Sequence, residues 1–225
     1  GLMPLILPGN VASATASTTY DVANSCRFND GDSSYMHKTL GTPTSDQKYT
    51  ISAWIKICTF DGNFSFWGSG SSSDGDYFNN YFDNDQFRHY ISDDDGHWLG
   101  TNGKYRDPSA WYHFCVGVDT TQSTDTNRVK VYVNGTQLTS FADTHYPDQN
   151  YNVPALASGK VMSVGRREAS ASYYFDGYVA EVVFIDGTQY AASDFGEFDE
   201  DSPMIWKPKD PSGLTFGTNG FYLDF

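Results

Sequence analysis

The chain has 225 residues, of which 39% are hydrophobic and 16% aromatic, which is enough to build a sizeable core and argues against a disordered chain. Its 28 Asp and Glu residues outnumber 14 Lys and Arg residues and give a net charge of −14. Phosphate backbones would be repelled, and no basic cluster offsets this charge, so the composition argues against a nucleic-acid partner.

The first 19 residues are expected to form an extended segment ahead of one domain at residues 20–225. The opening stretch, "GLMPLILPGN", contains five apolar side chains but is interrupted by Pro4 and Pro8 and has no basic flank. It is too short and too broken to cross a membrane or to serve as a signal sequence. We expect it to pack against the domain or against a neighbouring subunit, with no insertion into a membrane.

Beyond this segment, short apolar runs are separated by clusters of Gly, Asn, Asp, Ser and Pro, which is typical of an all-β domain. The stretch at residues 69–98, "SGSSSDGDYFNNYFDNDQFRHYISDDDGHW", is rich in polar residues, and outside one predicted strand it is expected to form long surface loops. The predicted strands are, in chain order, Val22–Phe28, Ser34–His37, Tyr49–Ile57, Phe64–Trp67, Gln86–Ser92, Trp111–Asp119, Arg128–Val133, Lys160–Gly165, Gly177–Ile185 and Phe216–Phe225.

Two segments carry the strongest local signals. "RVKVYVNGTQL", at residues 128–138, points its three valines to one side, and Asn134 and Gly135 supply the two residues with positive φ that a type I′ hairpin turn needs. "GYVAEVVFIDG", at residues 177–187, is apolar on both faces apart from Glu181. This second strand must therefore be covered on both sides.

The three cysteines, Cys26, Cys58 and Cys115, are too few and too scattered for a disulfide framework or a zinc site. Their odd number leaves at least one free thiol. Because a free cysteine is usually a core residue, we expect all three to be unpaired and buried.

Five segments, in this order, resemble successive strands of laminin-G-like, concanavalin A-like jelly rolls: "YTISAWIKI", "WYHFCVGVD", "RVKVYVNGTQL", "GKVMSVGRR" and "FDGYVAEVVFIDG". The resemblance covers roughly residues 20–190. It implies an all-β fold, a two-sheet antiparallel β-sandwich of the concanavalin A-like jelly-roll type.

The segments on either side of this region restrict the resemblance to one subgroup of the family. "SCRFNDGDSSYMHKT" and "FGEFDEDSPMIWKPKDPSGLTFGTNGFYLDF" are similar to a subgroup found in phages, especially marine ones, in tail-fibre and other virion surface proteins. In that subgroup the chain usually continues beyond the segment that matches "NGFYLDF". The resemblance therefore implies a protein of the virion surface.

"GEFDED", at residues 196–201, places Glu197, Asp199 and Asp201 at every second position, an arrangement similar to the catalytic carboxylates of jelly-roll glucanases. Retaining hydrolysis needs two carboxyl groups about 5–5.5 Å apart, one of them with a raised pKa. Pro203 follows within two residues, which argues against a central strand. Crowded acids beside Gly and Pro give neither burial nor a defined pair, so we expect a solvated turn and no catalytic residue.

Calcium is the one cofactor that the family resemblance suggests, because laminin-G-like domains often bind it at a loop rim. The acidic loops Asp74–Asp76, Asp83–Asp85 and Asp93–Asp95 could supply some of the six to eight oxygens that calcium takes. Short acidic loops also serve as turns, and none of these has EF-hand spacing. No metal-binding residue is assigned.

A carbohydrate ligand would need exposed aromatic faces beside polar side chains. The candidate ligand-binding residues border the polar loops: Trp67, Tyr77, Tyr81, Asp94 and Trp98. The other tryptophans, Trp54, Trp111 and Trp206, lie in strand-like or packed contexts and are expected in the core.

A lone charge in an apolar strand is costly, so Glu181 is expected to pair with Arg166, Arg167 or His113. His113, in "WYHF", is expected to be a packed strand residue and not a catalytic base, because no Ser or Cys nucleophile context accompanies it.

The architecture alone does not decide the function, because it hosts lectins, hydrolases and structural modules. The leading hypothesis is a non-enzymatic phage virion module, in a tail fibre or on a capsid, that binds a host glycan or protein through its loops and contacts other virion proteins. Fibre architecture favours a homo-oligomer, and a trimer would fit it. Two alternatives stay open, a glycoside hydrolase or lyase on the same scaffold and a calcium-dependent adhesive domain.

Overall fold

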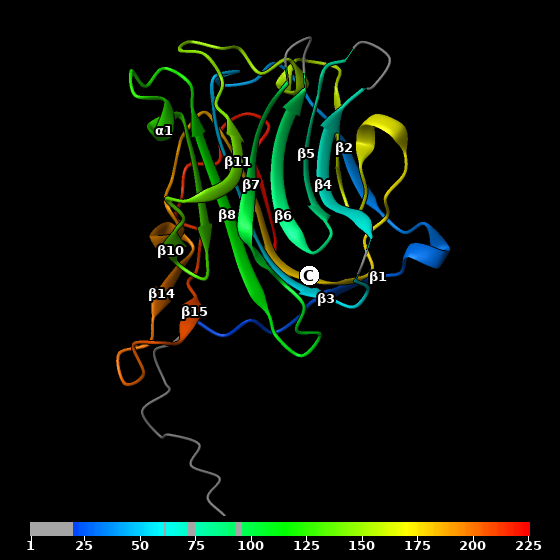
Figure 1. Cartoon of the computed structure of the whole chain (residues 1–225), viewed down its shortest axis with the longest axis vertical. Helices are drawn as coiled ribbons and strands as arrows, with labels where there is room; N and C mark the ends of the chain where they lie inside the picture. Colours follow the sequence, from blue (N-terminus) through cyan, green and yellow to red (C-terminus); the bar gives the residue numbers. More distant parts are fainter. Residues whose placement is uncertain (1–19, 61, 72–74, 93–95) are drawn as a thin grey trace, which may run out of the picture.

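Two seven-stranded antiparallel sheets pack face to face in the computed structural model, which describes residues 20–60, 62–71, 75–92 and 96–225 (Figure 1). The predicted antiparallel β-sandwich of the jelly-roll type is confirmed. The first 19 residues and Asp94 lie outside the described part of the chain. No helix in the described part is long and apolar enough to span a membrane.

The first sheet, sheet A, has the strand order β1-β13-β3-β8-β9-β10, with β16 also paired to β13. Its strands are β1 (Cys26–Phe28), β3 (Lys48–Ile57), β8 (Tyr112–Asp119), β9 (Val129–Val133), β10 (Thr136–Gln137), β13 (Gly177–Asp186) and β16 (Phe221–Leu223).

The second sheet, sheet B, has the order β11-β7-β6-β5-β4-β12-β2. Its strands are β2 (Met36–Thr39), β4 (Asn63–Gly70), β5 (Tyr77–Asp83), β6 (Gln86–Ser92), β7 (His97–Lys104), β11 (Phe141–His145) and β12 (Val161–Val164). β14 (Gly196–Phe198) and β15 (Trp206–Pro208) form a separate two-stranded sheet. The short helices are η1 (Asp30–Asp32), α1 (Asp125–Arg128), η2 (Pro154–Leu156), η3 (Glu168–Ser170) and η4 (Ala192–Asp194).

Aromatic rings fill the space between the sheets. Phe114 of sheet A lies with its ring centroid 4.7 Å from Phe87 and 5.5 Å from Phe82, both of sheet B. All three side chains are almost completely buried. Offset and edge-to-face ring pairs of this kind add to the area that each ring buries.

The predicted hairpin is confirmed. Asn134 and Gly135 have φ angles of 46° and 77° between β9 and β10, as a type I′ turn requires. The indole of Trp206 packs directly on Gly135, so a Cβ atom there would lie 2.3 Å from a ring carbon.

We expect the substitution Gly135→Ala to lower the free energy of unfolding by about 2–4 kcal/mol, because it combines a positive φ with an overlap of the indole ring. Urea denaturation checks this result. Gly213→Ala is the matched control, since a Cβ at that exposed glycine meets no atom within 4 Å. Equal changes in the two variants would contradict the packing of Trp206 on the turn.

Strand β13 is covered on both faces, as its apolar pattern predicts. One face contributes to the core between the sheets, and the other packs into a second cluster beneath the C-terminal segment, which includes Val183, Ile185 and Phe195. Between its pairing with β1 and its pairing with β16 the strand has a bulge, and Glu181 adopts a φ of 51° there.

The prediction that Glu181 pairs with Arg166, Arg167 or His113 is wrong. Its carboxylate accepts hydrogen bonds of 2.7 Å from the hydroxyls of Tyr20 and Tyr222, which approach from the two segments that flank the bulge. Burial raises the pKa of Glu181, and the two hydroxyls partly offset this effect. The bulge turns the carboxylate toward hydroxyl donors that sequence proximity does not reveal.

Other expectations also need correction. Residues 69–98 are not mainly loop, because β5 and β6 form a hairpin there with Asn84 and Asp85 at positive φ, and β7 starts at His97. Strand β11 was not predicted either. All three cysteines are unpaired as expected, but Cys58 is exposed and Cys26 is only partly buried.

Candidate functional site

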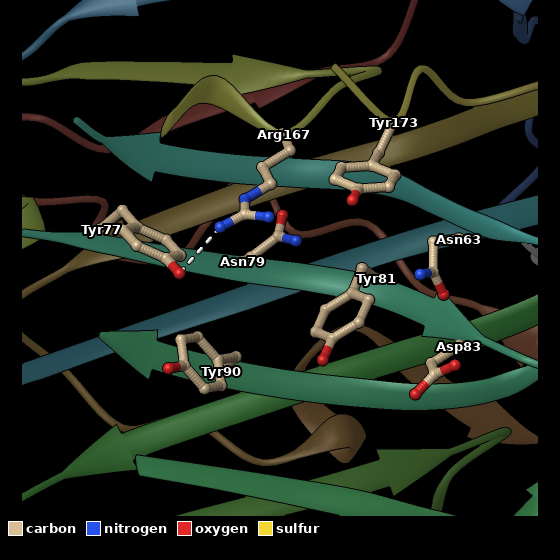
Figure 2. A pocket seen from close by; sticks show the side chains of 8 residues that line it. All are labelled: Asn63, Tyr77, Asn79, Tyr81, Asp83, Tyr90, Arg167 and Tyr173. Carbon is tan, nitrogen blue, oxygen red and sulfur yellow. Dashed lines mark hydrogen bonds between the residues drawn. The ribbon is translucent and has the colours of Figure 1, made fainter. Parts of the chain in front are cut away.

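The outward face of β5 carries polar and aromatic side chains at every second residue. Phe78 and Phe82 point into the core and are fully buried, whereas Tyr77, Tyr81 and Asp83 point away from it. This alternation follows from the pleat of the strand. Figure 2 shows the outward side chains along β5.

These side chains form the wall of a cavity of about 190 Å³, which we name the tyrosine pocket. This volume is below the roughly 300–1,000 Å³ of pockets for drug-sized ligands, so the pocket suits one ring of a larger ligand. The residues that line it are Asn63, Tyr77, Asn79, Tyr81, Asp83, Tyr90, Arg167 and Tyr173 (Figure 2).

Arg167 and Tyr173 reach the pocket from the loop after β12. Gly68 on β4 allows this loop to lie close to the sheet, because a Cβ there would come within 2.9 Å of the backbone nitrogen of Glu168. The loop is closed by backbone hydrogen bonds between Arg167 and Ser172. The lack of a side chain at Gly68 thus allows the loop to place the Arg167 guanidinium over sheet B.

The guanidinium of Arg167 lies among aromatic rings. Its Nη2 donates a hydrogen bond of 2.8 Å to the hydroxyl of Tyr77, and its Cζ lies 4.7 Å from the Tyr77 ring centroid and 5.6 Å from that of Tyr173. Burial raises the pKa of the Tyr81 hydroxyl, which therefore stays protonated and can both donate and accept.

An aromatic row continues from the pocket across the sheet. Tyr90 of β6 lies 5.8 Å from Tyr77 and is stacked on Trp98 of β7 at 6.3 Å between ring centroids. Trp98 in turn meets His145 of β11 edge-to-face at 5.0 Å. Register explains the row, because Tyr90 pairs with Trp98 and Trp98 pairs with His145 in the hydrogen-bonded sheet.

An ion pair crosses the same face. Arg88 of β6 donates to the carboxylate of Asp143 of β11 at 2.9 Å, although β7 lies between the two strands. Gly100 of β7 makes this crossing feasible, because a Cβ there would lie 2.4 Å from the Asp143 oxygen. The pair joins the edge strand of sheet B to its centre.

The structure brings together three of the five predicted ligand-binding residues. Tyr77 and Tyr81 line the pocket, and Trp98 continues the aromatic row beside it. Asp94 lies outside the described residues.

The assignment of Trp67 is wrong. Its side chain is fully buried and stacks on Phe221 at 5.7 Å between ring centroids. A register shift between Ser65 and Trp67 explains the error. Without it, strict alternation from Phe64 would turn Trp67 outward, whereas the bulge turns it into the core.

The site also includes residues that the sequence did not suggest, chiefly Asn79, Tyr90 and Arg167. Asn79 and Tyr90 could have been found from the pairing of β5 with β6, in which they face each other across the strands. No local signal identifies Arg167, because the folding of its loop over Gly68 places it.

The acidic segment does not form a groove. Glu197 and Asp199 lie at the β14–β15 hairpin, where Lys207 Nζ approaches their carboxylates to 3.4 and 3.6 Å, and Asp201 is exposed. Glu197 and Asp201 are exposed as expected, whereas Asp199 is half-buried and accepts hydrogen bonds from the backbone of Asp201 and Ser202. Glu197 and Phe198 belong to a short strand and not to a turn.

His113 and Ser52 form a buried pair that resembles a base and its nucleophile, with 2.8 Å between His113 Nε2 and Ser52 Oγ. Trp206 Nε1 donates to His113 Nδ1 at 3.1 Å, and an indole nitrogen can only donate. The ring proton therefore resides on Nε2, which donates to Ser52. Burial lowers the pKa of His113 to about 3, so the ring is neutral and cannot accept the serine proton through Nε2.

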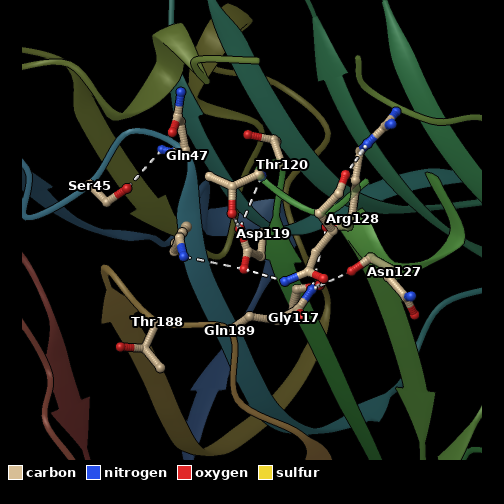
Figure 3. A network of polar contacts seen from close by, with 12 residues as sticks. Ser45, Gln47, Gly117, Asp119, Thr120, Asn127, Arg128, Thr188 and Gln189 are labelled. Atoms are coloured by element: carbon tan, nitrogen blue, oxygen red, sulfur yellow. Dashed lines mark hydrogen bonds and ion pairs between the residues drawn. The ribbon is translucent and has the colours of Figure 1, made fainter. Parts of the chain in front are cut away.

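A polar network closes one end of the sandwich (Figure 3). The Asp119 carboxylate accepts hydrogen bonds from Thr121 and Gln122, and Lys48 lies 3.3 Å away. Partial burial raises the pKa of Asp119, but these donors outweigh it and the net shift is downward. Since the carboxylate has protein donors around it, the network is structural.

The acidic loops provide no calcium ligand set within the described part of the chain. No group of three or more His, Cys, Asp or Glu residues there is arranged to hold a metal ion. Asp83 and Asp85 instead form ion pairs with Arg88 and Arg106. Asp74 and residues 93–95, from the other two loops, lie outside the described residues.

A larger groove of about 370 Å³ lies on the opposite side, over sheet A, and we name it the tryptophan groove. Its lining residues are Val22, Ala23, Asn24, Ser25, Trp54, Trp111, Ala180, Trp206, Lys207 and Pro208. The expectation that these three tryptophans lie in the core is therefore wrong. Trp111 is 36% exposed. The chain before Tyr20 lies outside the described residues, and we assign no ligand to this groove.

A family model described as the concanavalin A-like lectin/glucanases superfamily matches residues 29–192. A comparison with curated proteins finds no significant match.

Several solved structures share the fold at low sequence identity. A heptameric SAP-like pentraxin from Limulus polyphemus is 13% identical, with a TM-score of 0.53, and the match covers 76% of this chain and 80% of the pentraxin. Tailspike protein 2 from an Escherichia coli O157:H7 bacteriophage is 13% identical, with a TM-score of 0.54, over 88% of this chain but 26% of the tailspike. Domains LG4-5 of the mouse laminin alpha1 chain are 10% identical, with a TM-score of 0.53, over 89% of this chain and 47% of that chain. These similarities show the fold alone.

Proposed function

Because the chain belongs to the concanavalin A-like lectin/glucanase superfamily, we propose that it is a non-enzymatic adhesion module that binds a host-surface glycan on the outer face of sheet B. The observation that carries this proposal is the continuity of the tyrosine pocket with the aromatic row from Tyr90 to Trp98. Aromatic faces beside hydroxyl, amide and carboxylate groups can stack on sugar rings and hydrogen-bond to their hydroxyls.

Recognition on this face would come mainly from a rigid sheet, to which the loop after β12 adds Arg167 and Tyr173. Tyr77, Tyr81 and Asp83 lie on one strand, and the adjoining β6 and β7 hold their aromatic side chains in register. A platform of this kind loses little conformational freedom on binding, because two χ angles fix each ring.

We expect Tyr81→Ala and Trp98→Ala each to weaken glycan binding by about tenfold or more, since truncation of a central aromatic anchor commonly costs 2 kcal/mol or more. The measurement is binding to an array of bacterial surface glycans, followed by calorimetry with the best ligand. Trp111→Ala is the matched control, an exposed aromatic residue that directly precedes β8 of the opposite sheet. Equal loss in all three variants, or no binding to any glycan by the folded protein, would contradict the proposal.

The absence of catalysis is part of the proposal. It is supported by the exposed position of Glu197, by the engagement of Glu197 and Asp199 with Lys207, and by the proton arrangement at His113. Release of reducing ends from a polysaccharide panel, lost in Glu197→Gln or Asp199→Asn, would instead favour a glycoside hydrolase.

The proposed setting is the surface of a phage particle, in a tail fibre or on a capsid, where the module contacts other virion proteins as a homo-oligomer, with a trimer as the form to test first. Support comes from the resemblance of the flanking segments to phage surface proteins. Mass spectrometry of purified particles tests the location, and sedimentation of the isolated protein tests the oligomeric state.

A further inference from the structure

The six arginines of this acidic chain are not used alike. Four of them form ion pairs with carboxylates: Arg27, Arg88, Arg106 and Arg166. Arg128 donates to three backbone carbonyl groups. Arg167 differs from the other five. Within the described residues, its guanidinium has no carboxylate or carbonyl partner.

The donors of Arg167 are mostly unused. Nη2 donates to the Tyr77 hydroxyl, and Nε is buried without a hydrogen-bond partner. A buried donor that has no partner costs free energy in the unliganded protein. Because Nε is enclosed by the protein, a ligand would reach the guanidinium through its Nη nitrogens, and a planar anion with two oxygens matches that edge best.

The rest of the tyrosine pocket suits a neutral polar sugar ring and does not call for a cationic group on the ligand. Figure 2 shows Arg167 near Tyr77 at one end and Asp83 with Asn63 at the other, with Tyr81 between them. Asp83 is already engaged by Arg88 Nε at 3.3 Å and by the Asn84 amide at 2.8 Å. The anionic group of a ligand would therefore lie at the Arg167 end, and its hydroxyls at the other.

From this asymmetry we infer that the pocket selects an acidic saccharide, whose carboxylate or sulfate group binds Arg167 while the sugar ring lies against Tyr81. The inference rests on the proposed function and adds the chemical class of its ligand. The net charge of −14 would repel such a ligand at long range, so its recognition depends on Arg167, the one cation among the residues that line the pocket.

The test is an array that holds carboxylated and sulfated saccharides, each beside a neutral partner: polygalacturonate with its methyl ester, and dextran sulfate with dextran. We expect the wild-type chain to prefer the acidic member of at least one pair by tenfold or more. The two pairs separate carboxylate from sulfate recognition. We expect Arg167→Gln to lower binding of the acidic member by about 10- to 100-fold, as for loss of a hydrogen bond to a charged group, and to leave the neutral member unchanged.

Two further variants keep the result interpretable. Lys130→Gln removes one positive charge from β9 on sheet A, and an equal loss in this variant would mean general attraction of polyanions and would overturn the inference. Arg167→Lys keeps the charge without the fork and is expected to recover only part of the binding. Thermal unfolding of each variant confirms that it is folded.

The outcomes separate the two proposals. If neutral saccharides bind as tightly as acidic ones, and Tyr81→Ala abolishes both, the inference is wrong while the proposed glycan-binding function stands. If the folded wild-type protein binds no saccharide on any array, both are wrong.

Discussion

Acidification from pH 7 to pH 4 is expected to lower the free energy of unfolding steeply, by about 1.4 kcal/mol per pH unit for each of two buried histidines. Burial lowers the pKa of both His89 and His113 to about 3. Their partners are uncharged: His89 contacts the Tyr49 hydroxyl and the Asn80 amide, and His113 contacts Ser52 and Trp206. No neighbouring carboxylate is among these partners to stabilise the protonated rings.

The sign follows from where the protons bind. In the unfolded chain a histidine titrates near pH 6.5, so between about pH 6.5 and pH 3 the unfolded state binds more protons than the folded state. The stabilisation is complete above about pH 6.5 and is lost as the pH falls toward 3. Glu181 acts in the opposite direction, because its pKa is raised by burial, so it adds stability at low pH that is lost as the pH rises. One carboxyl group opposes two histidines, and the net effect is acid destabilisation.

Urea denaturation at pH 7, 5.5 and 4 measures the slope. His89→Gln and His113→Gln should each remove about half of it, and slopes are compared because either substitution can also change the absolute stability. A double variant with an undiminished slope would mean that other groups control the acid response.

Phe114→Ala is expected to lower the free energy of unfolding by about 3–5 kcal/mol, the range for truncation of a buried aromatic residue. Phe114 is 1% exposed and meets Phe66, Phe82, Phe87 and Tyr105 across the two sheets. These neighbours come from four different segments and cannot all move inward to fill the space. The removed ring therefore leaves a cavity between the layers.

The same urea measurement at pH 7 checks this expectation. Met204→Ala is the control, because that side chain is 93% exposed and its truncation should change stability by less than about 0.5 kcal/mol. A loss below about 1 kcal/mol for Phe114→Ala would contradict its central position in the core.

Local patterns predicted the β9–β10 hairpin and the doubly covered β13, because their signals lie within about ten neighbouring residues. Strand β5 escaped detection for a physical reason. The strand contains two Tyr-Phe pairs separated by two asparagines, so aromatic residues lie both on the inward face, at Phe78 and Phe82, and on the outward face, at Tyr77 and Tyr81. The alternation of apolar and polar residues that identifies a strand cannot be recognised in the sequence when both faces of the strand carry aromatic rings.

The binding face could be predicted only in part. Tyr77, Tyr81 and Trp98 were found because aromatic residues beside polar stretches stand out in the sequence. Trp67 and Arg167 depend on a bulge and on a loop that closes over Gly68, and neither has a local sequence signature. The tryptophan groove likewise depends on the C-terminal hairpin folding back onto β8 and β9, about 70 to 90 residues away in the sequence.

The pleat of β5 and β6 has a consequence for how this protein can change over time. Tyr77, Tyr81 and Asp83 of β5 and Gln86, Arg88 and Tyr90 of β6 lie on the outer face, while Phe78, Phe82, Phe87 and Ile91 between them are buried in the core. The positions proposed for recognition and the positions needed for folding thus alternate along the same strands. Substitutions at the outward positions can change recognition while the core positions stay the same. A single inserted or deleted residue would exchange the two sets at once, and for that reason diversification on this surface should proceed by substitution and not by changes in length.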